Sequence, residues 1–301
     1  MSASSTPLKG GLSPRYRCNP ANVEALMQTA TAIADDRNGE IIVLTVVESE
    51  NPNKLSEEDA IIKTARQLID RAIQRNEEFS QNDVPVSGLI RSGPKPAQEI
   101  LSTASQYNAD ELLIGWSGGS SPLKDIVFGR LIDTVANSAD CDVLIERVGG
   151  SELKSIDSIL VPISAGPHRL LSAKTAASLA RTYDAESTLV SVVGPATPQS
   201  DVDSRKSVLD DTAATINDIQ IETRMLRGEN IAETIIAETN NYDLTIIGAS
   251  GKGRLEEFVF DSITAKIARK GDGSIIITRR PKGVSSLERF RYWVSNRFPS
   301  G

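Results

Sequence analysis

The sequence predicts an α/β protein built from two similar domains, each a parallel sheet covered by helices on both faces. Three observations lead to this prediction. Short apolar runs alternate with longer segments of helical periodicity along the 301 residues. This alternation occurs twice, and a Gly/Gly/Ser joint at 149–151 separates the halves. In the second half, one apolar run enters a glycine-rich loop and a helical pattern follows.

Local patterns predict each element of the first half. Val23, Leu26 and Ile33 recur at helical spacing, and Gly39 ends that helix. Ser56 is the expected N-cap of the next helix, because Asp59 three residues later comes close to a capping box. Runs rich in Val, Ile and Leu predict the strands. The expected helices are 22–36, 56–80, 96–106 and 122–137, and the expected strands are 40–47, 84–91, 111–115 and 142–146.

The second half repeats this order of elements. Matching positions support an internal duplication: Thr29-Ala30 corresponds to Thr175-Ala176, Val46-Val47 to Val192-Val193, and Val127-Phe128 to Val259-Phe260. Because strands alternate with helices, right-handed crossovers and parallel sheets are expected in both halves. The expected strands are 159–163, 187–193, 219–226, 244–247 and 274–278, and the expected helices are 169–183, 201–216, 231–240 and the segment after the glycine loop.

Composition narrows the functional classes. With a net charge of −7 and no basic block before the C-terminus, the chain is not expected to bind nucleic acid. Cys18 and Cys141 form neither a CxxC motif nor a metal-ligand spacing, which favours a reducing compartment. His168 is the single histidine, so neither a catalytic triad nor a metal site is expected. No apolar run approaches the roughly 18 residues of a membrane span, and we expect a cytoplasmic protein.

The glycine loop is the segment with the clearest chemistry. Leu244 begins an apolar run that ends at Gly248, and Gly251 and Gly253 follow before helical periodicity resumes at Leu255. Successive backbone N–H groups of such a loop point inward, and the helix N-terminus adds a partial positive charge. The junction therefore predicts a binding site for an anion such as a phosphate.

The spacing of these glycines resembles that of the universal stress protein family. Its nucleotide-binding members carry Gly-x2-Gly-x9-Gly followed by Ser or Thr, and here Gly248, Gly251, Asp261 and Ser262 occupy those positions. Asp261 departs from the pattern, and a carboxylate beside a triphosphate costs on the order of 1 kcal/mol or more. The resemblance covers nearly all of residues 15–280, including the runs 140–145 and 158–163.

The resemblance implies two tandem flavodoxin-like (Rossmann-like) domains, each a five-stranded parallel sheet of order 3-2-1-4-5. The order of the strands then reverses between the first and the fourth strand. Ligands of open α/β sheets bind at that point, so the loops after Ile163 and Ile247 should face one ligand.

The family's nucleotide site can be carried over residue by residue. An Asp after the first strand and a Val on the second strand contact adenine and ribose in binding members, and Ser164 and Val192 occupy these positions here. Ser164 is a departure, because it lacks the charged acceptor. The implied ligand is ATP or another adenine nucleotide. The candidate binding residues are Pro162, Ser164, Val192, Gly248, Gly251, Lys252, Gly253, Ser262 and Ile263.

The first domain departs further from the family. Its loop from Gly115 to Pro122 is one residue longer, and Arg15 to Arg17 occupy the place of the central strand. A buried, unpaired arginine in a central strand costs several kcal/mol, so this strand is either displaced or degenerate. The expected organisation is a flexible leader at 1–14, domain 1 at 15–149, domain 2 at 155–280 and a basic amphipathic tail at 281–301.

Three functions fit these observations. The first is a regulatory or sensory module of the stress response that binds an adenine nucleotide without turnover, because no nucleophile, base or carboxylate pair marks a catalytic site. The second is a ligand-free interaction module that pairs through exposed closing strands, as members of the resembled family often do, either between the two domains of one chain or in a homodimer. Tandem domains of this family also occur as regulatory tails of transporters, so the tail, with Leu287, Phe290 and Trp293 at helical spacing, either packs on its own domain or contacts a transporter or membrane surface. The third is a slow ATP hydrolase.

Overall fold

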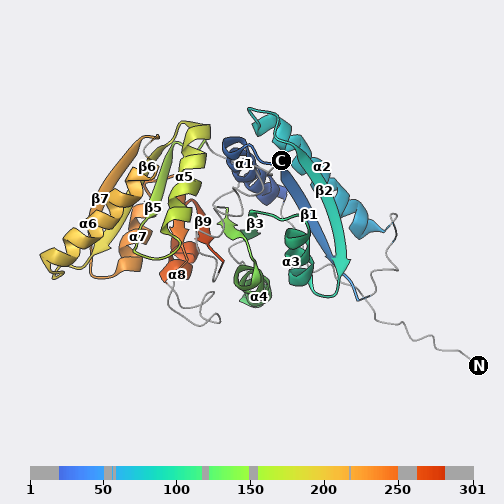
Figure 1. Ribbon diagram of the computed structural model, residues 1–301. Coiled ribbons are helices and arrows are strands. Elements are labelled where there is room, and N and C mark those ends of the chain that lie inside the picture. Colours follow the sequence, from blue (N-terminus) through green and yellow to red (C-terminus); the bar gives the residue numbers. More distant parts are fainter. Residues whose placement is uncertain are drawn as a thin grey trace, which may run out of the picture.

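The computed structural model shows two α/β halves side by side, with domain 2 on the left and domain 1 on the right in Figure 1. The described residues are 20–50, 56, 59–116, 122–148, 155–216, 218–249 and 263–281. Several sequence-based expectations lie outside these residues: the leader, the strand at 15–17, the glycine loop from residue 250 to 262 and the C-terminal tail.

Domain 1 contains the predicted helices and strands in the predicted order. They are α1 Pro20–Arg37, β1 Ile41–Glu48, α2 Ala60–Phe79, β2 Val86–Gly93, α3 Pro96–Gln106, β3 Glu111–Trp116, α4 Pro122–Ser138 and β4 Asp142–Arg147. The predicted N-cap of α2 is wrong. Asp59 is the N-cap, in an extended conformation, and its Oδ2 accepts a hydrogen bond of 2.7 Å from the backbone N of Ser56. The carboxylate therefore stabilises the turn before the helix, and α2 begins at Ala60.

Domain 2 follows the predicted order as well. Its elements are β5 Ser158–Pro162, α5 Arg169–Tyr183, β6 Glu186–Val193, α6 Gln199–Ala214, β7 Ile221–Arg227, α7 Ile231–Thr239, β8 Leu244–Gly248, α8 Ile263–Lys270 and β9 Ser274–Arg279. Asp184 ends α5 in the left-handed conformation, with φ of 54°. Asn230 caps α7 by accepting hydrogen bonds from the backbone N–H groups of Ala232 and Glu233.

One sheet of seven strands runs through both domains, in the order β3-β4-β9-β8-β5-β6-β7. All neighbouring strands are parallel except β4 and β9, which pair antiparallel and join the two domains. The part from domain 2 has the order β7-β6-β5-β8-β9, so its strand order reverses between β5 and β8. The closing strands of the two domains thus pair with each other within one chain.

Within the described residues, domain 1 shows four of its five expected strands. β1 and β2 form a separate parallel pair, whereas β3 and β4 belong to the large sheet. Among the described residues, no strand lies between β1 and β3, because the predicted central strand falls at 15–17. The residues of β1 from Ile41 to Val46 are half-buried, whereas β6, its counterpart in domain 2, is buried from Ser187 to Val193.

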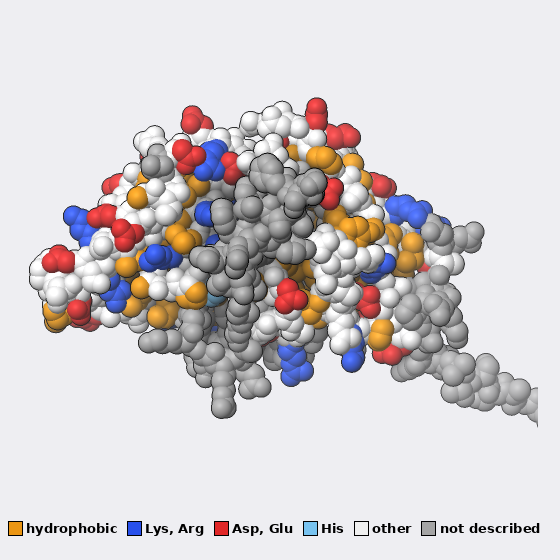
Figure 2. Space-filling model, viewed as in Figure 1, with side chains coloured by type: hydrophobic (Ala, Val, Ile, Leu, Met, Phe, Trp, Pro, Cys, Tyr) orange, Lys and Arg blue, Asp and Glu red, His pale blue; other side chains and the backbone are white. Residues whose placement is uncertain are grey.

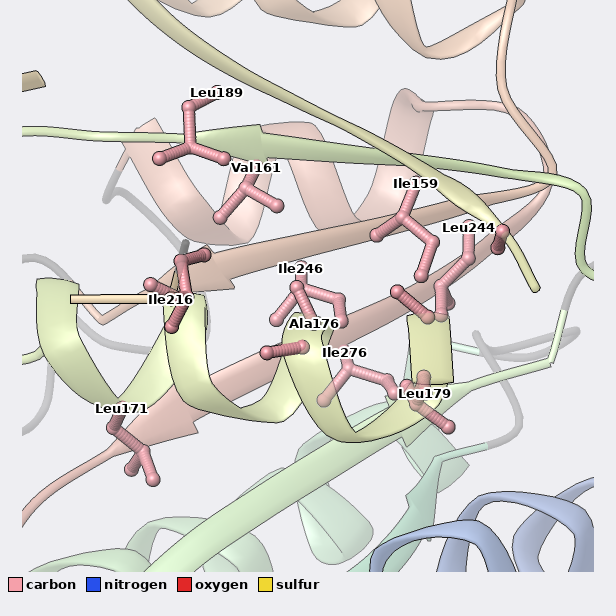
Figure 3. Close-up of a cluster of buried hydrophobic side chains, with 14 of the residues drawn as sticks. Ile159, Val161, Leu171, Ala176, Leu179, Leu189, Ile216, Leu244, Ile246 and Ile276 are labelled. Carbon is pink, nitrogen blue, oxygen red and sulfur yellow. The ribbon is translucent and has the colours of Figure 1, made fainter. Parts of the chain in front are cut away.

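The core lies on both faces of the large sheet. On one face, α5 packs over β5, β6, β8 and β9, and Figure 3 shows Leu179 of the helix together with Ile159, Ile246 and Ile276 of the strands. Ile33 of α1 belongs to the same cluster, so the core is continuous between the domains. On the other face, α4, α7 and α8 cover the sheet. Burial of these apolar faces from water is the main force that stabilises the fold.

The joint between the domains combines strand pairing with helix packing. β4 and β9 are centred on the pair Ile145 and Ile277, and α1 lies beside α5 (Figure 1). The hydroxyl of Tyr183 on α5 donates a hydrogen bond of 3.0 Å to the backbone oxygen of Gln28 on α1. The two domains therefore share a backbone ladder, apolar contacts and side-chain hydrogen bonds.

The surface carries both signs of charge. Figure 2 shows acidic and basic side chains interspersed over the described part of one face. None of the helices in the described ranges combines the length and the apolar character that crossing a membrane requires.

Candidate functional site

The candidate site lies at the carboxyl ends of β5 and β8. These strands are parallel neighbours, with Ile159 opposite Leu244 and Leu160 opposite Thr245. From their ends, one connection leads to α5 and the other towards α8. Because the strand order reverses here, the two connections lead towards helices on opposite faces of the sheet, and in open α/β sheets this is where a ligand crevice is expected.

Gly248 allows the first turn of α5 to approach the end of β8. A Cβ atom at this position would lie 3.1 Å from the Cβ of His168 and 3.4 Å from the Oγ of Ser172. Ser172 also lies 2.7 Å, oxygen to oxygen, from the hydroxyl of Thr278 on β9. The helix is thus fixed against both strands, and a larger residue at 248 would displace it.

Domain 1 contains the same close approach. A Cβ at Gly115, the counterpart at the end of β3, would lie 2.7 Å from a methyl carbon of Leu26 on α1. The residues 117–121, which contain most of the longer loop of this domain, lie outside the described residues. The repeated contact between a glycine and the first helix is structural support for the internal duplication.

Five of the sequence-predicted site residues lie within the described part of the chain. Pro162 ends β5 and is half-buried, and Ser164 is exposed in the loop that follows. Gly248 ends β8, and Ile263 is 46% exposed at the start of α8. Val192 is only 4% exposed and packs in the cluster that includes Ile247, so its side chain belongs mainly to the core.

The other predicted site residues lie outside the described residues: Gly251, Lys252, Gly253 and Ser262, together with the departing Asp261. The described residues on either side of this segment contact each other. The hydroxyl of Thr264 on α8 donates a hydrogen bond of 3.1 Å to the backbone oxygen of Gly248. The two ends of the glycine loop are therefore held close together at the crevice.

Sequence reasoning missed a group of basic residues beside Gly248. Arg279 ends β9 and Arg280 follows it, and the backbone N of Arg280 donates a hydrogen bond of 2.9 Å to the Nδ1 of His168. Burial, together with the charges of both arginines, lowers the pKa of His168 to about 4. The imidazole is therefore neutral at pH 7 and accepts this bond. The signal in the sequence was an Arg-Arg pair directly after the last strand, at the carboxyl end of the sheet.

Two further groups shape the electrostatics near the crevice. The carboxyl group of Asp133 on α4 has its pKa raised to about 6 by burial, although the charge of Arg279 acts in the opposite direction. Arg205 on α6 donates a hydrogen bond of 3.4 Å to the backbone oxygen of Val192. The described residues around these strand ends thus combine backbone groups and hydroxyls with the positive charges of Arg280 and of Arg279, which is 6% exposed, and positive charge suits an anionic ligand.

No group of three potential metal ligands occurs among the residues that the structure describes. A hollow over α2 is lined by Gln67, Asp70, Arg71, Gln74 and Arg75. Both of its arginines form ion pairs with Glu24, and Arg75 forms a second one with Glu78, so two carboxylates compensate the two charges. The crevice of domain 2 remains the stronger candidate for a ligand site.

These features define a class of protein: a tandem pair of α/β domains with a candidate ligand site at the strand-order reversal of domain 2. The sequence profile described as the Universal stress protein family matches residues 19–147 and again 155–279. The chain belongs to the universal stress protein family, with two copies of its domain.

Relatives of this architecture include transport proteins. The chain is 25% identical over 269 residues to the Na(+)/H(+) antiporter NhaS5 of Synechocystis sp., an alignment that covers 87% of the chain and 37% of the antiporter. The chain therefore spans little more than a third of the length of this curated relative.

Two solved structures share the overall fold along most of the chain. A universal stress protein from Archaeoglobus fulgidus has a TM-score of 0.62 at 15% identity, covering 87% of this chain and 93% of that protein. The cytoplasmic domain of a prokaryotic cation chloride cotransporter has a TM-score of 0.59 at 11% identity, covering 89% and 95%. At these identities the likeness concerns the fold.

Proposed function

We propose that this protein is a non-catalytic regulatory module of the cytoplasm that binds an adenine nucleotide in the crevice of domain 2 and acts on a membrane transport protein. The observation that carries the nucleotide part is the close packing of Gly248 on the first turn of α5, whose His168 accepts a hydrogen bond from the backbone N of Arg280, directly after Arg279 at the end of β9. Backbone groups at a glycine-lined strand end and nearby guanidinium groups are suited to a phosphate.

The exposed Ser164 fits a neutral polar contact to the nucleoside. The residue lies on the loop after β5, the strand that pairs with β8. A serine both donates and accepts hydrogen bonds but carries no charge. The nucleoside should therefore be bound more weakly here than in relatives with an aspartate at this position.

The regulatory part of the proposal is supported by the architecture and the relatives. A continuous seven-stranded sheet connects the crevice of domain 2 to domain 1, so a ligand that changes β8 or β9 also acts on β4. The antiporter relative and the cotransporter's cytoplasmic domain both belong to transport proteins. A transporter is thus the partner class that the comparisons support.

Thermal and denaturant stability with ATP, AMP and cyclic AMP tests the nucleotide site. Binding should raise the free energy of unfolding by about 2.7 kcal/mol at a ligand concentration 100 times the dissociation constant. Ser164→Asp should tighten adenosine binding by restoring a charged acceptor, and Ser200→Asp, on exposed α6, is the matched control. If no nucleotide stabilises the protein, the nucleotide proposal is wrong. Release of phosphate from bound ATP would instead support the hydrolase.

A further inference from the structure

The strand that joins the two domains contains a buried carboxyl group. Glu146 on β4 lies opposite Ile276 on β9 and opposite Gly115 on β3. The residue is only 3% exposed, and its Oε2 atom has no hydrogen-bond partner among the described residues. An isolated carboxylate is strongly destabilised in such surroundings unless it is paired with a cation.

The groups that face Glu146 come from both domains. The hydroxyl of Thr29 on α1 forms a hydrogen bond with its carboxyl group. Tyr183 on α5 is the titratable neighbour from domain 2: burial mainly raises the pKa of its phenol, and the charges of Glu146 and of Asp35 on α1 raise it further. The facing residues of β3 and β9 are uncharged. No cation contributes to the environment of Glu146 in the described part of the chain.

The duplication provides an internal comparison for this position. The pairing of β4 with β9 is centred on Ile145 and Ile277, which makes Thr278 of β9 the counterpart of Glu146. Thr278 is also buried, but its hydroxyl lies 2.7 Å from that of Ser172 and it carries no ionisable group. The joint therefore accommodates a small neutral side chain at one of its two equivalent positions and an acid at the other.

Burial raises the pKa of Glu146 to about 8, while the hydrogen bond with Thr29 acts in the opposite direction. The side chain is therefore neutral at pH 7 and ionises as the pH rises through about 8. Because this pKa lies above the value of 4.5 for an unperturbed glutamate, the folded state holds the proton more tightly than the unfolded state does. Its contribution to stability is complete below pH 4.5 and is lost as the pH rises through 8.

We propose that Glu146 is a proton-controlled latch between the two domains. When it is neutral, β4 remains paired with β9 and α1 remains packed on α5. When it is ionised, the unpaired charge favours a looser joint in which water reaches the carboxylate. The protein thereby senses alkaline pH, independently of any nucleotide.

Hydrogen exchange of the full-length chain between pH 6 and 9, corrected for the intrinsic exchange rate, tests this latch. In the wild type, protection of β4 and β9 should fall by up to tenfold per pH unit in this range, since one proton is linked to opening. Glu146→Gln should remove this pH dependence. Glu48→Gln, at the exposed end of β1, is the matched control and should retain it.

A second neutral variant and an NMR titration complete the test of the role of Glu146. Glu146→Thr copies the residue at the equivalent position of β9 and provides a second neutral variant if the glutamine variant folds poorly. In the wild type, the titration of the Glu146 carboxyl carbon followed by NMR should have its midpoint above pH 7. A midpoint near 4.5, or equal pH dependence of β4 and β9 protection in the wild type and both neutral variants, would overturn the proposal.

Discussion

Asp36 should be a principal polar contributor to the stability of the domain joint. Asp36 lies near the end of α1, and its carboxylate accepts three hydrogen bonds from residues of α5. Two, of 2.7 and 2.8 Å, come from the guanidinium group of Arg181, and one of 2.7 Å comes from the hydroxyl of Ser178. Arg181 also binds a second carboxylate, that of Asp218, through bonds of 2.8 and 3.1 Å. The side chain of Asp36 is 15% exposed and that of Asp218 is 56% exposed, so the same arginine offers a buried and an exposed partner for comparison.

Replacement of Asp36 by alanine removes the three hydrogen bonds that its carboxylate accepts from α5. A hydrogen bond to a charged group contributes about 1.5–3 kcal/mol, but these bonds share one carboxylate and are not additive. Arg181 is 35% exposed and retains Asp218, which lowers the loss further. We therefore expect Asp36→Ala to lower the free energy of unfolding by about 2–3 kcal/mol. Asp36→Asn should have about half this effect, because the amide oxygen still accepts the hydroxyl of Ser178.

Urea unfolding at pH 7 measures these differences directly, with Asp218→Ala as the matched control. The control should lose clearly less stability, since a solvent-exposed ion pair contributes little. A constant slope of the free energy against urea would show that the two domains still unfold together. Equal losses in Asp36→Ala and Asp218→Ala would refute the argument that burial at the joint strengthens the interaction.

Three other variants test local features of domain 2. Gly273 has φ of +68°, and a Cβ there would lie 3.0 Å from the backbone oxygen of Asp243. Gly273→Ala should therefore cost about 1–2 kcal/mol in thermal or urea unfolding, whereas Gly39→Ala, whose nearest contact is 3.7 Å, should cost about 0.5 kcal/mol or less. Because the pKa of His168 is lowered to about 4, its contribution to stability is present above pH 6.5 and is lost as the pH falls towards 4. In His168→Asn, the free energy of unfolding should fall less between these pH values, and an unchanged slope would contradict the assignment. Thr278→Val should cost about 1 kcal/mol in urea unfolding, because it removes the buried partner of the Ser172 hydroxyl, and no loss would show that this contact is replaceable.

The local elements of this protein could be predicted from its sequence. The limits of α3 and α5 agree with the predicted 96–106 and 169–183, because proline at the first position of α3 and the left-handed Asp184 after α5 act through neighbouring residues. The strand that ends in Gly248 and the internal duplication could also be predicted, because an apolar run and a repeated order of elements are both visible along the chain. The family followed from the same patterns, and its profile matches both halves.

The site was predictable only in part. Gly248 was identified from its position at the end of an apolar run, and the structure gives the reason for it in the contact with His168. Val192, in contrast, was expected to face a ligand and lies mainly in the core. The direction of its side chain depends on how α7 and α8 pack against the sheet, which the sequence of β6 alone does not specify.

Tertiary structure alone decided the direction and register of the strand pairing that joins the two domains. Nothing in the local pattern of β4 or β9 specifies that they pair antiparallel, because strand pairing depends on contacts between distant segments. For the same reason, the sequence around Glu146 predicts only that this residue ends an apolar strand. Its burial results from the pairing of β4 with β9 and from the packing of α1. The sequence determined which segments form helices and strands. The contact between the two domains determined which ionisable side chains, such as Glu146, are buried.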